Sequence, residues 1–124
     1  MKLLNFKAKE FACKCGCGLG DNILEMDLEL LNVLESIREH IRANYIKDAV
    51  IIINSGIRCP IHNKAVGGAV KSQHLLGKAS DIRVAGLTPK QLYDIINSLY
   101  PNKYGLGLYK TFVHIDVRSN KVRF

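Results

Sequence analysis

The sequence predicts a single α+β domain in which helices flank a small, mainly antiparallel sheet. Two segments, 27–47 and 88–100, place apolar residues at the spacing of one helix face. The last part of the chain predicts two short strands, about 105–109 and 112–118, joined closely enough to form a hairpin. With 124 residues, 48% of them hydrophobic and 23% charged, the chain has the size and composition of one globular domain over 1–124.

The first half of the chain predicts one helix, one buried strand and a long loop. The apolar face of segment 27–47 consists of Leu30, Leu31, Leu34, Ile37, Ile41 and Tyr45. Segment 49–56, AVIIINSG, has a continuous apolar run that ends in Asn-Ser-Gly, which is typical of a buried strand entering a loop. Segment 57–78 is rich in glycine and contains a proline, so we expect irregular or briefly helical backbone whose side chains can converge.

The second half predicts a strand, a helix and the hairpin. Segment 80–86, SDIRVAG, resumes the sheet. Thr88 is a good N-cap and Pro89 suits the first helical position, so we expect the second helix to begin there. Lys110 and Thr111 are expected at the bend between the two hairpin strands.

The charge pattern limits the classes of partner. The formal net charge of +7 suits an anionic partner, but Lys and Arg are scattered rather than concentrated in a stripe, so we expect no nucleic-acid partner. No stretch approaches the roughly 20 apolar residues that span a membrane, so no membrane partner is expected. Charges at Lys7, Lys9 and Glu10 interrupt the first apolar run, and we therefore expect synthesis in the cytoplasm without a signal peptide.

Two separated blocks carry side chains of the kind that bind zinc. The block SQHLLGKASD contains His74 and Asp81, an imidazole and a carboxylate with small residues between them. In FVHID, strand alternation places His114 and Asp116 on one face. Three protein ligands and one open position form a catalytic zinc site, in which the metal activates water and polarises a carbonyl group. Each block alone is a weak signal, because a single His on an apolar strand is more often a buried core residue.

Taken together, the blocks resemble a known family. The run SGIRCPIHNKAVGGAVKSQHLLGKASDIRV, followed by GLGLYKTFVHIDVR, is similar to the M15 metallopeptidases, from about residue 5 to the end of the chain. That family includes D-alanyl-D-alanine carboxypeptidases, L-alanyl-D-glutamate endopeptidases and many phage endolysins. The resemblance implies the α+β fold that these peptidases share with hedgehog signalling domains.

The resemblance also implies roles for individual residues. The zinc ligands of the family correspond to His74, Asp81 and His114. Arg58 corresponds to an arginine beside the substrate, and a guanidinium suits a peptide carboxylate or carbonyl group. Ser72 and Gln73 flank the first ligand, and we expect them to orient the substrate or to support the ligand.

The general base is left open by the sequence. Several relatives carry Glu or Asp three residues before the last ligand, where this chain has Thr111. Asp116 is the available carboxylate on the same strand face, and it can act as the catalytic base, accept a proton or orient His114. Relatives with H-x-H use the second residue as the ligand, so an exchange in which Asp116 binds zinc and His114 performs acid–base work also stays open.

Four cysteines form a second candidate group. They are Cys13, Cys15 and Cys17 in CKCGCG, and Cys59 beside Arg58. The C-x-C-x-C spacing is tighter than the usual zinc knuckle. A structural metal site, one or two disulfides, and free thiols therefore all stay open.

These residues and the resemblance imply a Zn²⁺-dependent hydrolase that cuts amide bonds in peptidoglycan peptides. The expected context is a monomeric phage or prophage enzyme that degrades the cell wall, at lysis or as part of the virion. The alternative is a catalytically silent zinc-binding domain of the same fold that binds the cell wall or the virion; Thr111 keeps it open and Arg58 argues against it. The sequence does not specify which bond is cut, D-Ala-D-Ala, L-Ala-D-Glu or a cross-bridge.

Overall fold

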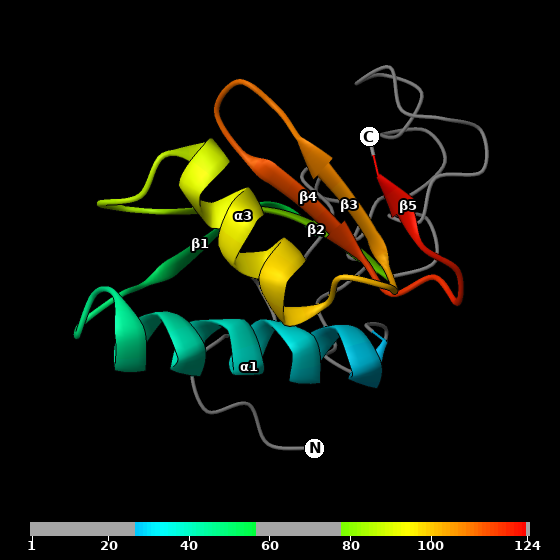
Figure 1. The fold of residues 1–124 in the computed structure, drawn as a ribbon, viewed down its shortest axis with the longest axis horizontal. Helices are drawn as coiled ribbons and strands as arrows, with labels where there is room; N and C mark the ends of the chain where they lie inside the picture. Colours follow the sequence, from blue (N-terminus) through cyan, green and yellow to red (C-terminus); the bar gives the residue numbers. More distant parts are fainter. Residues whose placement is uncertain (1–26, 57–77, 124) are drawn as a thin grey trace, which may run out of the picture.

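The computed structural model describes residues 27–56 and 78–123, which form two helices and a five-stranded sheet (Figure 1). The helices are α1, Leu28–Asn44, and α3, Pro89–Leu99. The strands are β1, Ile51–Ser55; β2, Ala79–Val84; β3, Gly105–Leu108; β4, Val113–Asp116; and β5, Val122–Arg123. The predicted class, a small α+β fold with flanking helices, is confirmed.

Both helices begin directly after a capping residue, and the cap at Thr88 was predicted from the sequence. The Asp27 carboxylate accepts hydrogen bonds from the backbone N–H groups of Glu29 and Leu30, at 2.9 and 3.3 Å. At α3, the Thr88 hydroxyl accepts from the Gln91 N–H, and the Gln91 side chain accepts from the Thr88 N–H, which forms a capping box.

The first helix ends earlier than the prediction of 27–47. Tyr45 adopts φ −131° and ψ −61°, which is not helical backbone. The N–H groups of Tyr45 and Ile46 both donate to the carbonyl of Ile41, at 2.8 and 2.9 Å, so the chain turns out of the helix there. Residues 45–47 therefore lead toward β1 instead of extending α1.

The sheet has the order β1-β2-β4-β3-β5, and its neighbouring strands are antiparallel except for the parallel pair β3–β5. The predicted hairpin is confirmed as β3–β4, and the N–H of Tyr109 donates to the carbonyl of Phe112 at 3.0 Å across its bend. Both hairpin strands are shorter than predicted. Strand β5 was not predicted, because it is only two residues long and depends on a distant partner, with the Val122 N–H donating to the Tyr104 carbonyl at 3.0 Å.

One face of the sheet builds the core with both helices. Its strand residues are aliphatic and buried: Ile51, Ile53, Ile82, Val84, Leu106, Val113 and Ile115. They share one buried cluster with the apolar faces of α1 and α3. Alternation along the strands therefore directs the intervening side chains to the opposite face, away from the helices. No helix in the described ranges is long and apolar enough to cross a membrane.

Candidate active site

Two of the predicted zinc ligands lie opposite each other on neighbouring strands. Asp81 of β2 and His114 of β4 are Cα partners in the antiparallel register, and both belong to the sheet face that points away from the core. Asp116 follows on the same face of β4. The β2–β4 pairing thus joins an acidic residue and a histidine from distant parts of the sequence.

The His114 ring bridges the two carboxylates. Its Nδ1 lies 3.1 Å from Oδ1 of Asp81, and its Nε2 lies 2.7 Å from Oδ2 of Asp116. The side chains of His114 and Asp81 are 12% and 7% exposed, and that of Asp116 is fully buried. Each ring nitrogen therefore has a fixed carboxylate neighbour in a largely dry environment.

Asp116 is held by Arg118 in a two-point ion pair. Arg118 Nε donates to Oδ1 and Nη2 donates to Oδ2, both at 2.7 Å. The backbone N–H of Arg118 also donates to Oδ1, at 3.2 Å. Both oxygens of the buried carboxylate thus accept charge-assisted or backbone hydrogen bonds.

Gly105 provides the space for the Asp116 carboxylate. It is the Cα partner of Asp116 across the β3–β4 pair. A β-carbon at this position would lie 2.6 Å from Cγ of Asp116 and closer still to both carboxylate oxygens. A side chain on residue 105 is therefore incompatible with this position of the carboxylate.

The charges in the site raise the pKa of His114 and lower the pKa of Asp116. Burial alone would lower the pKa of His114, but the hydrogen bonds and charges of Asp116 and Asp81 outweigh it, so the pKa of His114 lies above its usual value. Burial opposes ionisation of Asp116, yet His114 and Arg118 hold the pKa of its carboxyl well below the usual range. The site thus holds Asp116 as a carboxylate.

The donor set of the described residues fits a zinc ion in part. The Asp81 carboxylate and the His114 Nδ1 atom lie 3.1 Å apart and are two ligands of the type that zinc binds. Within residues 27–56 and 78–123, no group of three His, Cys, Asp or Glu side chains is placed to hold a metal ion. A complete site therefore needs a ligand from elsewhere in the chain.

The remaining predicted site residues lie outside the part of the chain that the structure describes. They are His74, Arg58, Ser72, Gln73, Cys13, Cys15, Cys17 and Cys59. Their predicted roles stay predictions. Thr111, by contrast, is described, and it is exposed at the bend between β3 and β4.

Two residues of the site were missed by the sequence reasoning, Arg118 and Gly105. The signal for Arg118 was present, because H-x-D-x-R continues the alternation that puts His114 and Asp116 on one face. The signal for Gly105 required the hairpin register, which decides that this glycine faces Asp116.

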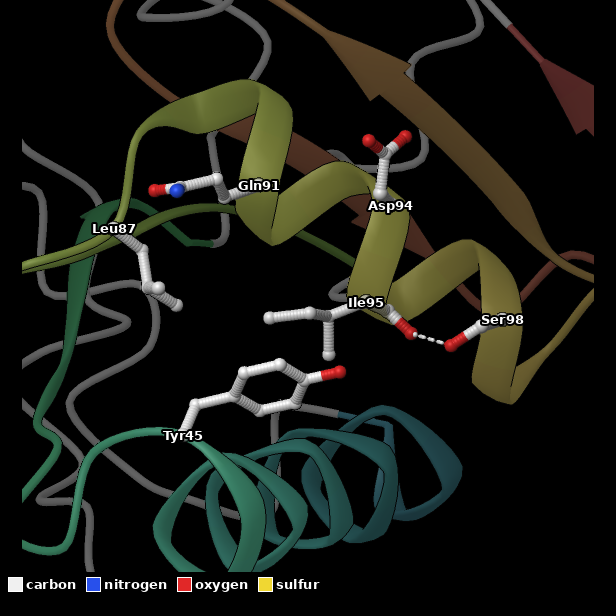
Figure 2. A pocket seen from close by; sticks show the side chains of 6 residues that line it. All are labelled: Tyr45, Leu87, Gln91, Asp94, Ile95 and Ser98. Atoms are coloured by element: carbon white, nitrogen blue, oxygen red, sulfur yellow. Dashed lines mark hydrogen bonds between the residues drawn. The ribbon is translucent and has the colours of Figure 1, made fainter.

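A separate hollow of about 370 Å³ lies beside the helices (Figure 2). Its lining residues are Tyr45, Leu87, Gln91, Asp94, Ile95 and Ser98. Figure 2 shows them on α3, at the end of α1 and on the turn after β2, so the hollow lies on the helix side of the sheet. Neither Asp81 nor His114 lines it, and the hollow is therefore distinct from the candidate active site.

A family comparison shows the class of protein in which this fold and this pairing of a carboxylate with an imidazole occur. The family model described as Peptidase M15 matches residues 4–116, which include Asp81, His114 and Asp116. The chain therefore belongs to the peptidase M15 family and is a peptidase by family. No curated protein matches the chain.

Proposed function

We propose that this chain is a zinc-dependent peptidase that hydrolyses amide bonds in peptidoglycan peptides, with zinc bound by His74, Asp81 and His114. The observation that carries the proposal is the 3.1 Å approach of His114 Nδ1 to the Asp81 carboxylate across neighbouring strands. Membership of the peptidase M15 family supports the same assignment.

The orientation of the His114 ring supports its role as a ligand. Ligating histidines almost always donate their second ring N–H to a carboxylate or carbonyl group. Nε2 of His114 has such a partner in Asp116 at 2.7 Å, which leaves Nδ1 directed toward Asp81. The ring is thus arranged to offer Nδ1 to a metal ion that also contacts Asp81.

Among the roles left open for Asp116, its contacts support the orienting role. A general base must come within hydrogen-bond reach of the proton that it abstracts. The Asp116 side chain is fully buried, and both of its oxygens accept hydrogen bonds from Arg118 or His114. The exchange in which Asp116 binds the metal would require Asp116 to give up a hydrogen bond to His114 or to Arg118.

The proposed chemistry divides between the metal and the protein. A bound zinc ion supplies the Lewis acidity that polarises the scissile carbonyl and activates the attacking water. Asp81 and His114, together with His74, would hold the ion, and the hydrogen bond to Asp116 keeps the His114 ring in place. Arg58 is proposed to hold a carboxylate or carbonyl group of the substrate, as its guanidinium suits either.

Two observations support a cell-wall substrate. The M15 family is the first, and the net charge of +7, which favours accumulation at an anionic surface such as a cell wall, is the second. The context that we propose with it is a monomeric enzyme of a phage or prophage that acts on the wall.

The proposal is tested by digesting purified peptidoglycan fragments and measuring the product masses. Cleavage is expected to stop with a chelator, to return with added zinc, and to be absent in His74→Ala and Asp81→Asn. The product masses then identify the bond. Asp94→Asn is the matched control, because Asp94 is an exposed carboxylate paired with Lys90 on α3, and it should leave cleavage unchanged.

Measuring the zinc bound to the protein in the same samples separates the two functions left open by the sequence. Zinc uptake without cleavage of any fragment would contradict the peptidase and favour a silent zinc-binding domain. Cleavage that is insensitive to chelation, or retained in Asp81→Asn, would contradict the metal site.

A further inference from the structure

The Arg118–Asp116 ion pair lies behind the proposed metal site, on the side of His114 away from Asp81. We propose that Arg118 is a positioning residue: its guanidinium fixes the Asp116 carboxylate, and that carboxylate fixes the His114 ring with Nδ1 toward Asp81. This inference rests on the proposed function, because it states how the same site is kept in order.

The geometry of the ion pair restrains rotation of the carboxylate. Arg118 contacts both oxygens at 2.7 Å, one through Nε and one through Nη2, and this two-point contact defines the plane of the carboxylate as well as its position. A single contact, such as an ammonium group makes, would leave the group free to turn. The backbone N–H of Arg118 adds a third restraint at 3.2 Å.

Arg118 and His114 contact the same atom of the Asp116 carboxylate, so the restraint on that atom also restrains the His114 ring. Oδ2 of Asp116 is contacted by both Arg118 Nη2 and His114 Nε2, each at 2.7 Å. Fixing this atom fixes the direction of the Nε2 hydrogen bond. A ring turned by 180° would place carbon atoms where the two nitrogens now lie, and would lose the contacts with both carboxylates.

The β3 backbone closes the other side of the arrangement. The Asp116 carboxylate packs so closely against Gly105 that a β-carbon would collide with it. The carboxylate is thus confined between the backbone of Gly105, which carries no side chain, and the guanidinium of Arg118. If the ion pair only stabilised the fold, a positive charge at residue 118 would be enough, and the two-point contact would not be required.

A second arginine offers a matched control. Arg123 of β5 is also partly buried, and its guanidinium donates to Asn97 Oδ1 at 2.9 Å and to the carbonyls of Tyr104 and Tyr100, at 2.8 and 2.7 Å. These contacts join β5 to α3 and its following turn and involve none of Asp81, His114 and Asp116. If any replacement of a hydrogen-bonded arginine by lysine weakened zinc binding, Arg123→Lys should therefore weaken it as much as Arg118→Lys.

The experiment measures the zinc dissociation constant by chelator competition in the wild type, Arg118→Lys and Arg123→Lys. Lysine keeps the charge beside Asp116, whereas Arg118→Ala would leave the buried carboxylate with His114 but without its arginine and is expected to destabilise the domain strongly. We expect Arg118→Lys to weaken zinc binding about tenfold, as is typical for partners of ligating histidines. Arg123→Lys should leave the constant unchanged.

A double-mutant cycle tests whether Arg118 acts through Asp116. In an Asp116→Asn background, Arg118→Lys should cause little further loss of zinc affinity, because the fork then has no carboxylate to fix. An unchanged zinc constant in Arg118→Lys, or losses that simply add in the double variant, would overturn the inference while leaving the proposed zinc site intact.

A second readout keeps the test independent of zinc. The ring N–H protons of ¹⁵N-labelled His114 in the metal-free protein report whether the Nε2–H remains hydrogen-bonded. Arg118→Lys should speed the exchange of this proton with water, and Arg123→Lys should not. If the wild type binds no zinc, the proposed function fails, and equal exchange in all three proteins would then overturn the inference as well.

Discussion

Gly105 shows how closely the site depends on single atoms. A methyl group at this position would collide with the Asp116 carboxylate, which cannot move aside while Arg118 holds both oxygens. We expect Gly105→Ala to lower the free energy of unfolding by about 1–3 kcal/mol, the range for overpacked sites, and to weaken zinc binding. Urea unfolding and chelator competition measure the two effects. Ser119→Ala, at an exposed position, should change neither, and a Gly105→Ala protein with wild-type values would contradict the close packing.

Tyr104 predicts a loss of stability at alkaline pH. Burial, with the hydrogen bond of 2.7 Å to Glu29, raises the pKa of Tyr104 above its usual value of about 10. As pH rises above this value, the unfolded chain loses the phenol proton while the folded chain retains it, so the free energy of unfolding falls.

The measurement for Tyr104 compares urea unfolding at pH 8 and at pH 11 in the wild type and in Tyr104→Phe. The variant should lose about 1 kcal/mol at pH 8, because the hydrogen bond to Glu29 is missing. It should then lose less than the wild type between the two pH values. An equal loss in both proteins would show that Tyr104 does not contribute to the loss of stability at alkaline pH.

The residues of the site differ in how far they could be predicted. His114 and Asp116 share a strand, so alternation alone put them on one face. The contact between Asp81 and His114 depends on the β2–β4 register, which no local pattern encodes. The family resemblance predicted that Asp81 and His114 act together as zinc ligands, and the structure gives the distance between their side chains.

Among the helices and strands, the N-cap of α3 allows the most specific prediction of a stability change. The Thr88 hydroxyl accepts from the Gln91 N–H at 3.1 Å and anchors the helix start beside the end of β2. Thr88→Ala should reduce the free energy of unfolding by about 1 kcal/mol, as measured by thermal or urea unfolding. Thr111→Ala, at an exposed bend, should stay within about 0.5 kcal/mol, and an equal effect of both variants would argue against the cap.

The elements themselves were predicted best where local chemistry specifies them. Asp27 and Thr88 set the helix starts, and apolar runs set the central strands. Element ends were less predictable, as at the C-terminus of α1, because they depend on where the next contact turns the chain. Strand β5 could not be foreseen, since a two-residue strand has no pattern of its own.

At the scale of the whole molecule, the helices and the candidate site occupy opposite faces of one sheet. The core on the helix side fixes the strands, and the strands fix Asp81 and His114. Metal binding on one face should therefore stabilise the entire fold. At a free zinc concentration about 100 times the dissociation constant, we expect a gain of about 2.7 kcal/mol in the free energy of unfolding.

Zinc-dependent stability is measured by urea unfolding with and without the metal. The gain should be small or absent in Asp81→Asn and complete in Asp94→Asn, whose carboxylate pairs with Lys90 far from the site. A gain of full size in Asp81→Asn would place the stabilising zinc elsewhere in the chain, for example at the four cysteines.

The most direct test of the proposed metal site is a crystal structure of the zinc-loaded protein with the metal located by its anomalous scattering. We expect zinc at about 2.0–2.2 Å from both His114 Nδ1 and an Asp81 oxygen, with Nε2 still hydrogen-bonded to Asp116. Zinc bound only away from Asp81, or bound through Nε2 with the contact to Asp116 broken, would contradict it.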